Sequence, residues 1–203
     1  MIETLAAPTD RLVLGGVHHT ARPTWKLKET VVFYRDLLGL PLVHAVSAHG
    51  WGPADHPDFL HFFFDSGNGS TIAFFYYIGT TQPAHLVHHA KYDNDATHTA
   101  WRVESADDLA GWRRWLEEHG VEVMFQIQHE IVESIYFRDP NGYLLEIGRP
   151  TRTLTPLDAR EAEMTVAAAL ALEEAGPLTS IDAVWREKGN AVLRAFAAEE
   201  AVR

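Results

Sequence analysis

The chain contains two copies of one unit, and each copy opens with the phrase His-Thr-Ala. The phrases are His19-Thr20-Ala21 and His98-Thr99-Ala100. A stretch with helical spacing follows each phrase and ends near a glycine, Gly39 in the first copy and Gly120 in the second, before a Val-rich run. A duplication of this kind restricts the fold to two similar halves. Because each half presents one histidine, the pattern indicates a metal held between them.

Each unit reads as a strand, a helix and three further strands. The first unit has predicted strands at residues 12–21, 42–46, 59–64 and 71–77, and a helix that carries Leu27, Val31, Tyr34 and Leu38 on one face. The second has predicted strands at residues 97–103, 121–126, 131–137 and 143–147, and a helix capped by Ser105 and Asp108. The predicted fold class is α+β, with one βαβββ module at about residues 10–80 and another at about 97–150.

Two segments lie outside the modules. Residues from about 80 to 96 form a polar linker insertion, which leaves residues 1–153 as one domain. Residues 154–203 turn to Ala and Glu and predict a two-helix extension, with one helix at about 156–175 and another from 181 to the end. We expect these helices to cover the sheet exterior or to pair two subunits of a homo-oligomer, with a dimer favoured.

The composition restricts the kinds of metal ligand and the classes of partner that are possible for this chain. The chain has no cysteine, so a metal would have to be held by nitrogen and oxygen ligands. Its formal net charge of -11 disfavours nucleic acid and anionic membrane surfaces, because both require Lys and Arg to neutralise phosphate. No stretch has the pattern of a signal peptide or a membrane span. A cytoplasmic protein that acts on a small molecule is therefore expected.

Three stretches resemble the vicinal oxygen chelate superfamily, which includes glyoxalases, extradiol dioxygenases, fosfomycin-resistance enzymes and bleomycin-binding proteins. They are Val17-His18-His19-Thr20, residues 32–40 (VFYRDLLGL) and residues 136–146 (YFRDPNGYLLE). The resemblance covers about residues 12–149. It implies that paired βαβββ modules form a half-open mixed β-barrel around a metal, with ligands on the first strand of each module and on the last strand of the second.

The resemblance implies that the metal ligands are His19, His98 and Glu146. It selects His19 over His18, because the family spaces its first ligand fourteen residues before the position of Phe33. The His-Thr-Ala repeat makes the same choice. Two neutral imidazoles and one carboxylate suit Fe(II) and leave coordination positions open for substrate and dioxygen. Mn(II) and Zn(II) are the alternatives.

The duplication also predicts which residue lies at the fourth ligand position of the metal site. Aligning Asn68-Gly69 with Asn141-Gly142 matches Glu146 with Ala73, which cannot bind a metal. Glyoxalase I and related isomerases use a fourth protein ligand at that position. The alanine therefore argues against them and favours a substrate that coordinates the metal directly.

A narrower resemblance lies in residues 127–146. Ile127-Gln128-His129, Ile135-Tyr136, Asp139-Pro140, Gly142 and Glu146 follow the order found in type I extradiol ring-cleavage dioxygenases. This implies a small aromatic, catechol-like substrate and O2 as the co-substrate. Tyr136 would hydrogen-bond a catecholate oxygen and help to remove its proton, and His129 would orient the substrate.

One position departs from that signature. Extradiol enzymes of this type carry an acid/base histidine where this chain has Ser70, and a serine has no pKa near neutrality. His85, His88 and His89 of the insertion are candidates to replace it. Alternate members of the aromatic run at residues 74–77 are expected to face the pocket, and Phe75 and Tyr77 would then line a site for a planar ring.

Two other function classes stay open. A redox-neutral member of the superfamily, such as a thiol transferase, lyase or isomerase, would use the same ligands without Tyr136 or oxygen. A metal-free small-molecule-binding resistance protein is the third class, and a complete ligand triad counts against it. The remaining strand histidines, His61 among them, are interpreted as ordinary core or surface residues, and Asp107-Asp108 as helix-cap charges.

Overall fold

The computed structural model describes residues 17–49, 56–88, 95–177 and 179–201, with side chains as far as Arg194. The chain divides into two compact units, Met1–Pro150 and Thr151–Arg203. The first unit contains both βαβββ modules, and the second contains the two C-terminal helices.

The first module forms one four-stranded sheet with a helical segment. Its elements are β1 (His19–Thr24), α1 (Leu27–Val31), the π-helix η1 (Val32–Leu37), β2 (Leu42–Ala48), β3 (Phe59–Gly67) and β4 (Ser70–Tyr77). The strand order is β1-β4-β3-β2, with β1 parallel to β4 and the other neighbours antiparallel. Asn68 and Gly69 both have positive φ in the turn between β3 and β4, as the predicted hairpin requires.

The second module repeats this topology. After the short 3-10 helix η2 (Ala84–Leu86) come β5 (Thr99–Arg102), α3 (Ala106–Glu118), β6 (Phe125–Gln128), β7 (Val132–Arg138) and β8 (Leu144–Pro150). The strand order β5-β8-β7-β6, again with one parallel pair, matches that of the first sheet. The predicted α+β class and paired modules are confirmed: the described strands form two four-stranded mixed sheets and do not close into a barrel.

Several strand boundaries differ from the prediction by a few residues, and the changes in β1 and β6 have a clear structural reason. β1 continues beyond Ala21 to Thr24, and it tolerates Pro23 because it is an edge strand of its sheet. β6 begins only at Phe125, where pairing with Tyr136 starts. The residues before it, Val121 among them, are hydrophobic because they pack against the core and not because they lie in a strand.

The predicted helix of the first module changes character along its length. It begins as α-helix at Leu27 and becomes the π-helix η1 at Val32, where the wider turn is closed by a 2.9 Å bond from Leu38 N–H to the Phe33 carbonyl. Phe33 and Tyr34 are adjacent and both are buried, so this segment places two consecutive aromatic rings in the core.

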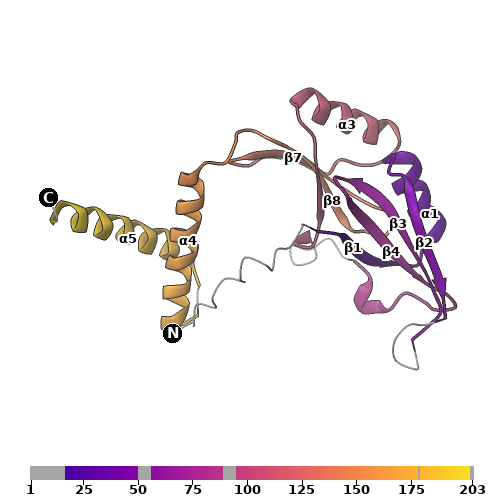
Figure 1. Cartoon of the computed structure of the whole chain (residues 1–203), viewed down its shortest axis with the longest axis horizontal. Helices are drawn as coiled ribbons and strands as arrows, with labels where there is room; N and C mark the ends of the chain where they lie inside the picture. The colour runs from indigo at the N-terminus through magenta and orange to yellow at the C-terminus, as the bar shows by residue number, and fades with distance from the viewer. Residues whose placement is uncertain (1–16, 50–55, 89–94, 178, 202–203) are drawn as a thin grey trace. The chain divides into compact units, whose positions relative to one another are not determined.

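The hydrophobic core lies between the sheets and their helices. Figure 1 shows α1 and α3 along one side of the two sheets, and a 3.0 Å bond from Trp115 Nε1 to the Leu37 carbonyl joins the two helical segments. Alternate strand residues face this core, including Phe74, Leu145 and Ile147. The intervening residues face the opposite side, which is where the predicted ligands belong.

Polar contacts at the turn before β8 join the two modules. Asp139 accepts a 3.1 Å bond from the Tyr34 hydroxyl, and the Asn141 amide donates to the Thr30 hydroxyl at 3.0 Å. Burial raises the pKa of Asp139, although the donors around the carboxyl group act in the opposite sense. Arg22 is also buried here and lies over the ring of Tyr143, 4.9 Å from its centroid.

The second unit is a pair of helices, α4 (Pro156–Ala175) and α5 (Ile181–Ala201). Both begin where the sequence predicts. Thr155 and Asp158 form a capping box at the start of α4, and Lys188 Nζ lies 2.5 Å from Glu161 Oε1, which links the helices. Among the described residues, no helix combines the length and apolar character needed to cross a bilayer. The proposed covering or pairing role of these helices stays a prediction.

Candidate active site and metal ligands

The sheet register places the two predicted histidines at equivalent positions. In the first module Ala21 is the partner of Ala73, and in the second Ala100 is the partner of Glu146. Ala21 and Ala100 each lie two residues after the histidine of their His-Thr-Ala phrase. The register therefore confirms that Ala73 is the structural counterpart of Glu146 and that this position has no ligand in the first module.

His98 and Glu146 are brought together. His98 lies just before β5, and its Nε2 is 3.0 Å from Glu146 Oε2. Its Nδ1 is 2.9 Å from the Asp95 carbonyl oxygen, which can only accept, so Nδ1 carries a proton and Nε2 faces the carboxylate. Histidines that bind metals are typically oriented by such a bond from the other ring nitrogen. The donor atoms are an imidazole nitrogen and a carboxylate oxygen, a set that fits Fe(II), Mn(II) or Zn(II).

Glu146 is held by a second contact from the neighbouring strand. The Ser134 hydroxyl donates to Glu146 Oε1 at 2.5 Å, and both residues are buried. Gly148 makes this approach possible, because a Cβ atom there would lie 2.7 Å from Ser134 Oγ. The serine and the glycine were missed by sequence reasoning; their place on the same face of the hairpin as Glu146 was the available signal.

Tyr136 lies directly across β7 and β8 from Glu146. Its hydroxyl is 3.0 Å from His129 Nε2, and the tyrosine is buried whereas His129 is exposed. Burial is the main cause that raises the pKa of Tyr136, followed by the negative charge of Glu146. The expected position of Tyr136 beside Glu146 is therefore observed, and His129 connects it to solvent.

His19 lies on the open face of the first sheet. Its ring is 5.7 Å from that of Phe63, and its Nδ1 is 2.8 Å from Nδ1 of His18. In the part of the chain that the structure describes, no three His, Asp or Glu side chains gather closely enough to hold a metal. The structure thus pairs His98 with Glu146 without grouping His19 with them, and the third ligand stays a prediction.

An aromatic platform occupies the same face of the first sheet and consists of His61, Phe75 and Tyr77. Phe75 and Tyr77 are parallel within 9°, with ring centroids 5.9 Å apart. His61 stacks on Phe75 at 3.6 Å and 7°, and its Nδ1 donates to the Phe74 carbonyl at 3.1 Å. Burial is the main influence that lowers the pKa of His61. The β3–β4 pairing of His61 with Phe75 is the signal that the sequence interpretation passed over.

The candidates for the missing acid/base group lie in different surroundings. Ser70 opens β4 opposite Gly67, and His85 is exposed in η2. The His88 ring is 4.1 Å from that of Tyr143, a residue of the hydrophobic core, so His88 contacts the core side of the sheet and does not lie beside Tyr136. His89 lies outside the described residues.

Comparison with known proteins agrees with the fold. Residues 16–147 match the model of the Glyoxalase/Bleomycin resistance protein/Dioxygenase superfamily. The chain belongs to this superfamily. The match includes the first module and the second as far as Ile147 in β8, one residue after Glu146, so the C-terminal helices lie outside it.

Relatives within the superfamily have different activities in their names. The "Putative ring-cleaving dioxygenase MhqA" of Bacillus subtilis (strain 168) is 36% identical over 50 residues, which span 25% of this chain and 16% of that protein. The solved structure of a "putative dioxygenase" from Bacillus subtilis subsp. subtilis str. 168 is 28% identical in sequence, with a TM-score of 0.50. The match covers 66% of this chain and 40% of the chain in that structure. The Listeria monocytogenes fosfomycin resistance protein FosX shares the fold at 18% identity and a TM-score of 0.50, covering 68% of this chain and 96% of its own.

The bond from Ser134 gives a test of how Glu146 is held. Ser134→Ala is expected to weaken Fe(II) binding by about 10-fold to 100-fold, because the carboxylate loses the donor that orients it. Anaerobic Fe(II) titration measures the change, with Ser66→Ala, in the β3–β4 hairpin, as the control. Unchanged Fe(II) affinity in Ser134→Ala would show that Glu146 does not hold iron through this geometry.

Proposed function

We propose that this chain is an extradiol-type dioxygenase that cleaves a catecholic ring with O2, using Fe(II) held by His19, His98 and Glu146. The observation that carries the proposal is the Tyr136 hydroxyl, which lies across the hairpin from Glu146 and 3.0 Å from His129 Nε2. The two Bacillus subtilis relatives support it, since both are named as dioxygenases.

Tyr136 and His129 provide a route for a proton to leave the site. When the Tyr136 hydroxyl donates to His129 Nε2, its oxygen can accept a proton from a substrate hydroxyl nearby. The proton of Tyr136 then passes to His129, which is exposed and exchanges it with water. A catechol needs this step because it must lose protons before both of its oxygens can act as ligands.

Each remaining component has a defined contribution. Bound Fe(II) would supply coordination positions for the two catechol oxygens and for dioxygen. One carbon–carbon bond of the ring breaks, and both atoms of O2 enter the ring-opened product. Phe75 and Tyr77 would hold the planar ring on the open face of the first sheet.

The test combines binding, oxygen uptake and one variant. Protein loaded anaerobically with Fe(II) is expected to bind members of a panel of catechols and, once O2 is admitted, to consume it as a yellow product forms. Tyr136→Phe is expected to lower turnover by about 100-fold or more, because the proton acceptor is lost, while the iron content is unchanged. Tyr76→Phe, which keeps the ring and removes a hydroxyl on the core-facing side of β4, is the control.

Three outcomes would contradict the proposal. Loaded protein that neither binds nor cleaves any catechol would exclude ring cleavage. Turnover of a substrate without O2, supported by Mn(II) or Zn(II) and unaffected in Tyr136→Phe, would indicate a redox-neutral lyase, transferase or isomerase. Turnover that stays at the wild-type level in Tyr136→Phe under O2 would remove the tyrosine from the mechanism.

A metal-free small-molecule-binding protein is the second candidate function. It is favoured by one observation, that no group of three ligand side chains forms among the described residues. This alternative predicts that the protein holds no stoichiometric metal after anaerobic reconstitution and binds an aromatic ligand equally well in Glu146→Gln. Iron bound at one equivalent and lost in Glu146→Gln would exclude it.

A further inference from the structure

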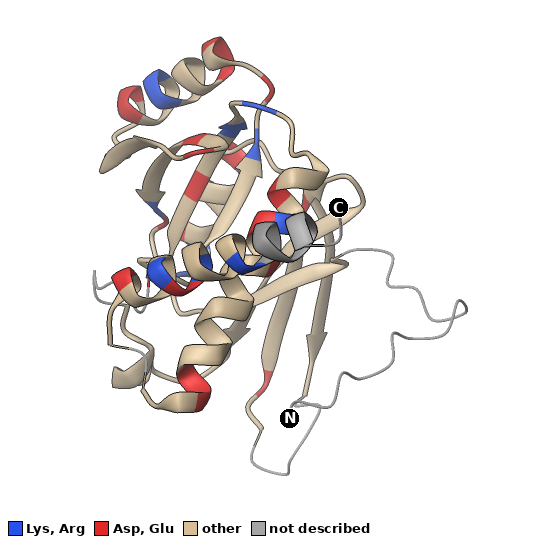
Figure 2. Ribbon diagram, turned by 90° about the vertical axis from the view of Figure 1, so that its left-hand side faces the viewer, with Lys and Arg blue, Asp and Glu red and all other residues tan. Residues whose placement is uncertain are grey.

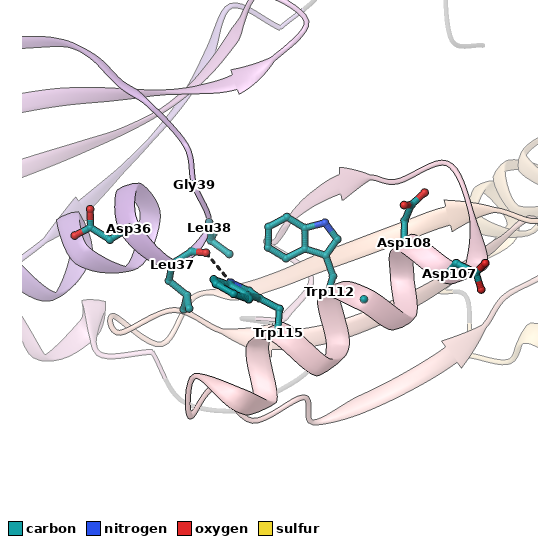
Figure 3. A pocket seen from close by; sticks show the side chains of 9 residues that line it. Asp36, Leu37, Leu38, Gly39, Asp107, Asp108, Trp112 and Trp115 are labelled. Carbon is teal, nitrogen blue, oxygen red and sulfur yellow. Dashed lines mark hydrogen bonds between the residues drawn. The ribbon is translucent and has the colours of Figure 1, made fainter.

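A cleft lies between the helical segments of the two modules, away from the predicted metal ligands. It has a volume of about 460 Å³ and is lined by the end of η1 and one side of α3 (Figure 3). At the cleft, Leu38 belongs to the core and Trp112 packs against it. Ile147 of β8 is also a core residue, whereas its neighbour Glu146 faces the other side of that strand. The cleft is therefore separate from the proposed dioxygenase site.

Two indole rings form the apolar wall. Trp112 is half-buried, and Trp115 is 42% exposed. The Nε1–H of Trp115 donates to the Leu37 carbonyl at 3.0 Å, so the ring is fixed beside η1 while much of it remains uncovered (Figure 3). A fixed, exposed tryptophan in a cleft is a common feature of ligand sites, because its ring gives a large contact area.

Gly111 keeps the cleft open. It lies in the interior of α3, where glycine is less favourable than alanine, and it is one of the lining residues. Its φ is not in the left-handed region, and a Cβ atom there would meet nothing within 4 Å. Neither backbone conformation nor packing requires a glycine at this position. A side chain introduced at this position would occupy the cleft beside Trp112 and Trp115.

A smaller cavity continues from the cleft toward the core. It has a volume of about 150 Å³ and shares Leu38 and Trp112 with the cleft. Its other lining residues are Leu40, Trp101, Val103, Ile147 and Arg102, whose guanidinium group is paired with Glu104 at 2.8 Å. An apolar cavity of this size is large enough to hold one benzene ring. The two cavities together offer an apolar end and an open, polar end.

The charged groups at the open end are all acidic. Asp36, Asp107 and Asp108 line the cleft, and none of its lining residues is Lys, Arg or His. Asp36 is paired with Arg35 and Asp108 caps α3, whereas Asp107 has no hydrogen-bond or ion-pair partner among the described residues. Figure 2 shows acidic residues at both ends of α3 with basic ones between them. An anion would be repelled here, whereas a cation would meet carboxylates and the indole of Trp112. The Trp115 ring is already in contact with His119, with 3.9 Å between the ring centroids.

We propose that this cleft binds a small aromatic ammonium compound, with its cationic group near Asp107 and its ring against Trp112. The probe is phenethylammonium, titrated while the indole Nε1–H signals are followed by NMR. Saturable shifts of the Trp112 and Trp115 signals are expected. The uncharged isostere 2-phenylethanol is expected to bind at least about 3-fold more weakly, and 3-phenylpropionate to cause no saturable shift.

Two variants test the site at separate points. Gly111→Leu is expected to abolish the shifts by filling the cleft, and to be at least as resistant to heat as the wild type because leucine favours a helix. Asp107→Asn is expected to weaken binding by about 3-fold to 10-fold. Gly189→Leu in α5, where a side chain also meets nothing, and Glu118→Gln at the other end of α3 are matched controls that should bind like the wild type.

Other results would overturn the proposal. These are the absence of saturable shifts in the wild type, equal binding of 3-phenylpropionate, or binding by a folded Gly111→Leu variant with wild-type affinity. The experiment needs neither metal nor turnover, so its result is independent of whether the chain proves to be a dioxygenase.

Discussion

Replacing Glu146 with glutamine is expected to weaken Fe(II) binding by more than about 100-fold and to remove catechol cleavage. This loss of affinity is larger than the loss expected for a residue that only orients a ligand, such as Ser134, because the carboxylate supplies the only negative charge among the three predicted ligands. Glutamine keeps the shape of the side chain and can still accept the bond from Ser134. The change therefore isolates the charge. Anaerobic Fe(II) titration followed by oxygen uptake with a catechol measures both effects.

Matched variants distinguish an effect on the metal site from the general effect of removing a charge or an imidazole. Glu118→Gln removes the same charge from the exposed end of α3 and is expected to bind iron normally. His19→Ala is expected to lose iron as His98→Ala does, whereas His18→Ala, one residue earlier, is expected to retain it. Wild-type iron affinity in Glu146→Gln would end the metal assignment, and a reversed result for His18 and His19 would correct the register.

The features that could be predicted from the sequence depend on local spacing. Two Asn-Gly turns set the register of the hairpins that contain β4 and β8, and alternation along a strand then decides which residues share a face. The pairing of Ala73 with Ala21 and of Glu146 with Ala100 follows from that register. Helix starts were predictable for a similar reason, since caps such as Ser105 act within one turn.

The features that could not be predicted depend on contacts between distant segments. The bond from Trp115 to Leu37 that borders the cleft joins residues 78 positions apart, and no local pattern encodes it. The orientation of His98 depends on a carbonyl oxygen of Asp95, which any residue type would supply. Distances between the two sheets are also set by packing, so equivalent positions for His19 and His98 did not establish that their side chains meet.

Asp139→Ala is expected to have the largest effect on stability, lowering the free energy of unfolding by roughly 3–5 kcal/mol. The carboxylate is 5% exposed and accepts bonds from the backbone N–H groups of Asn141 and Tyr143, at 2.8 and 2.9 Å, and from the Tyr34 hydroxyl at 3.1 Å. Alanine leaves all of these donors without that acceptor, and each unpaired buried donor costs about 1–3 kcal/mol unless water reaches it. Urea unfolding at equilibrium measures the loss.

Tyr34→Phe is the graded control, because it keeps the ring packed on Phe74 and removes only one of the bonds to Asp139. Its expected cost is about 1 kcal/mol. The comparison also tests the junction between the modules, since the Tyr34–Asp139 bond spans 105 positions and crosses from one βαβββ unit to the other. A loss below about 1 kcal/mol for Asp139→Ala would mean that water replaces the carboxylate. The apolar core would then hold the two modules together without these bonds.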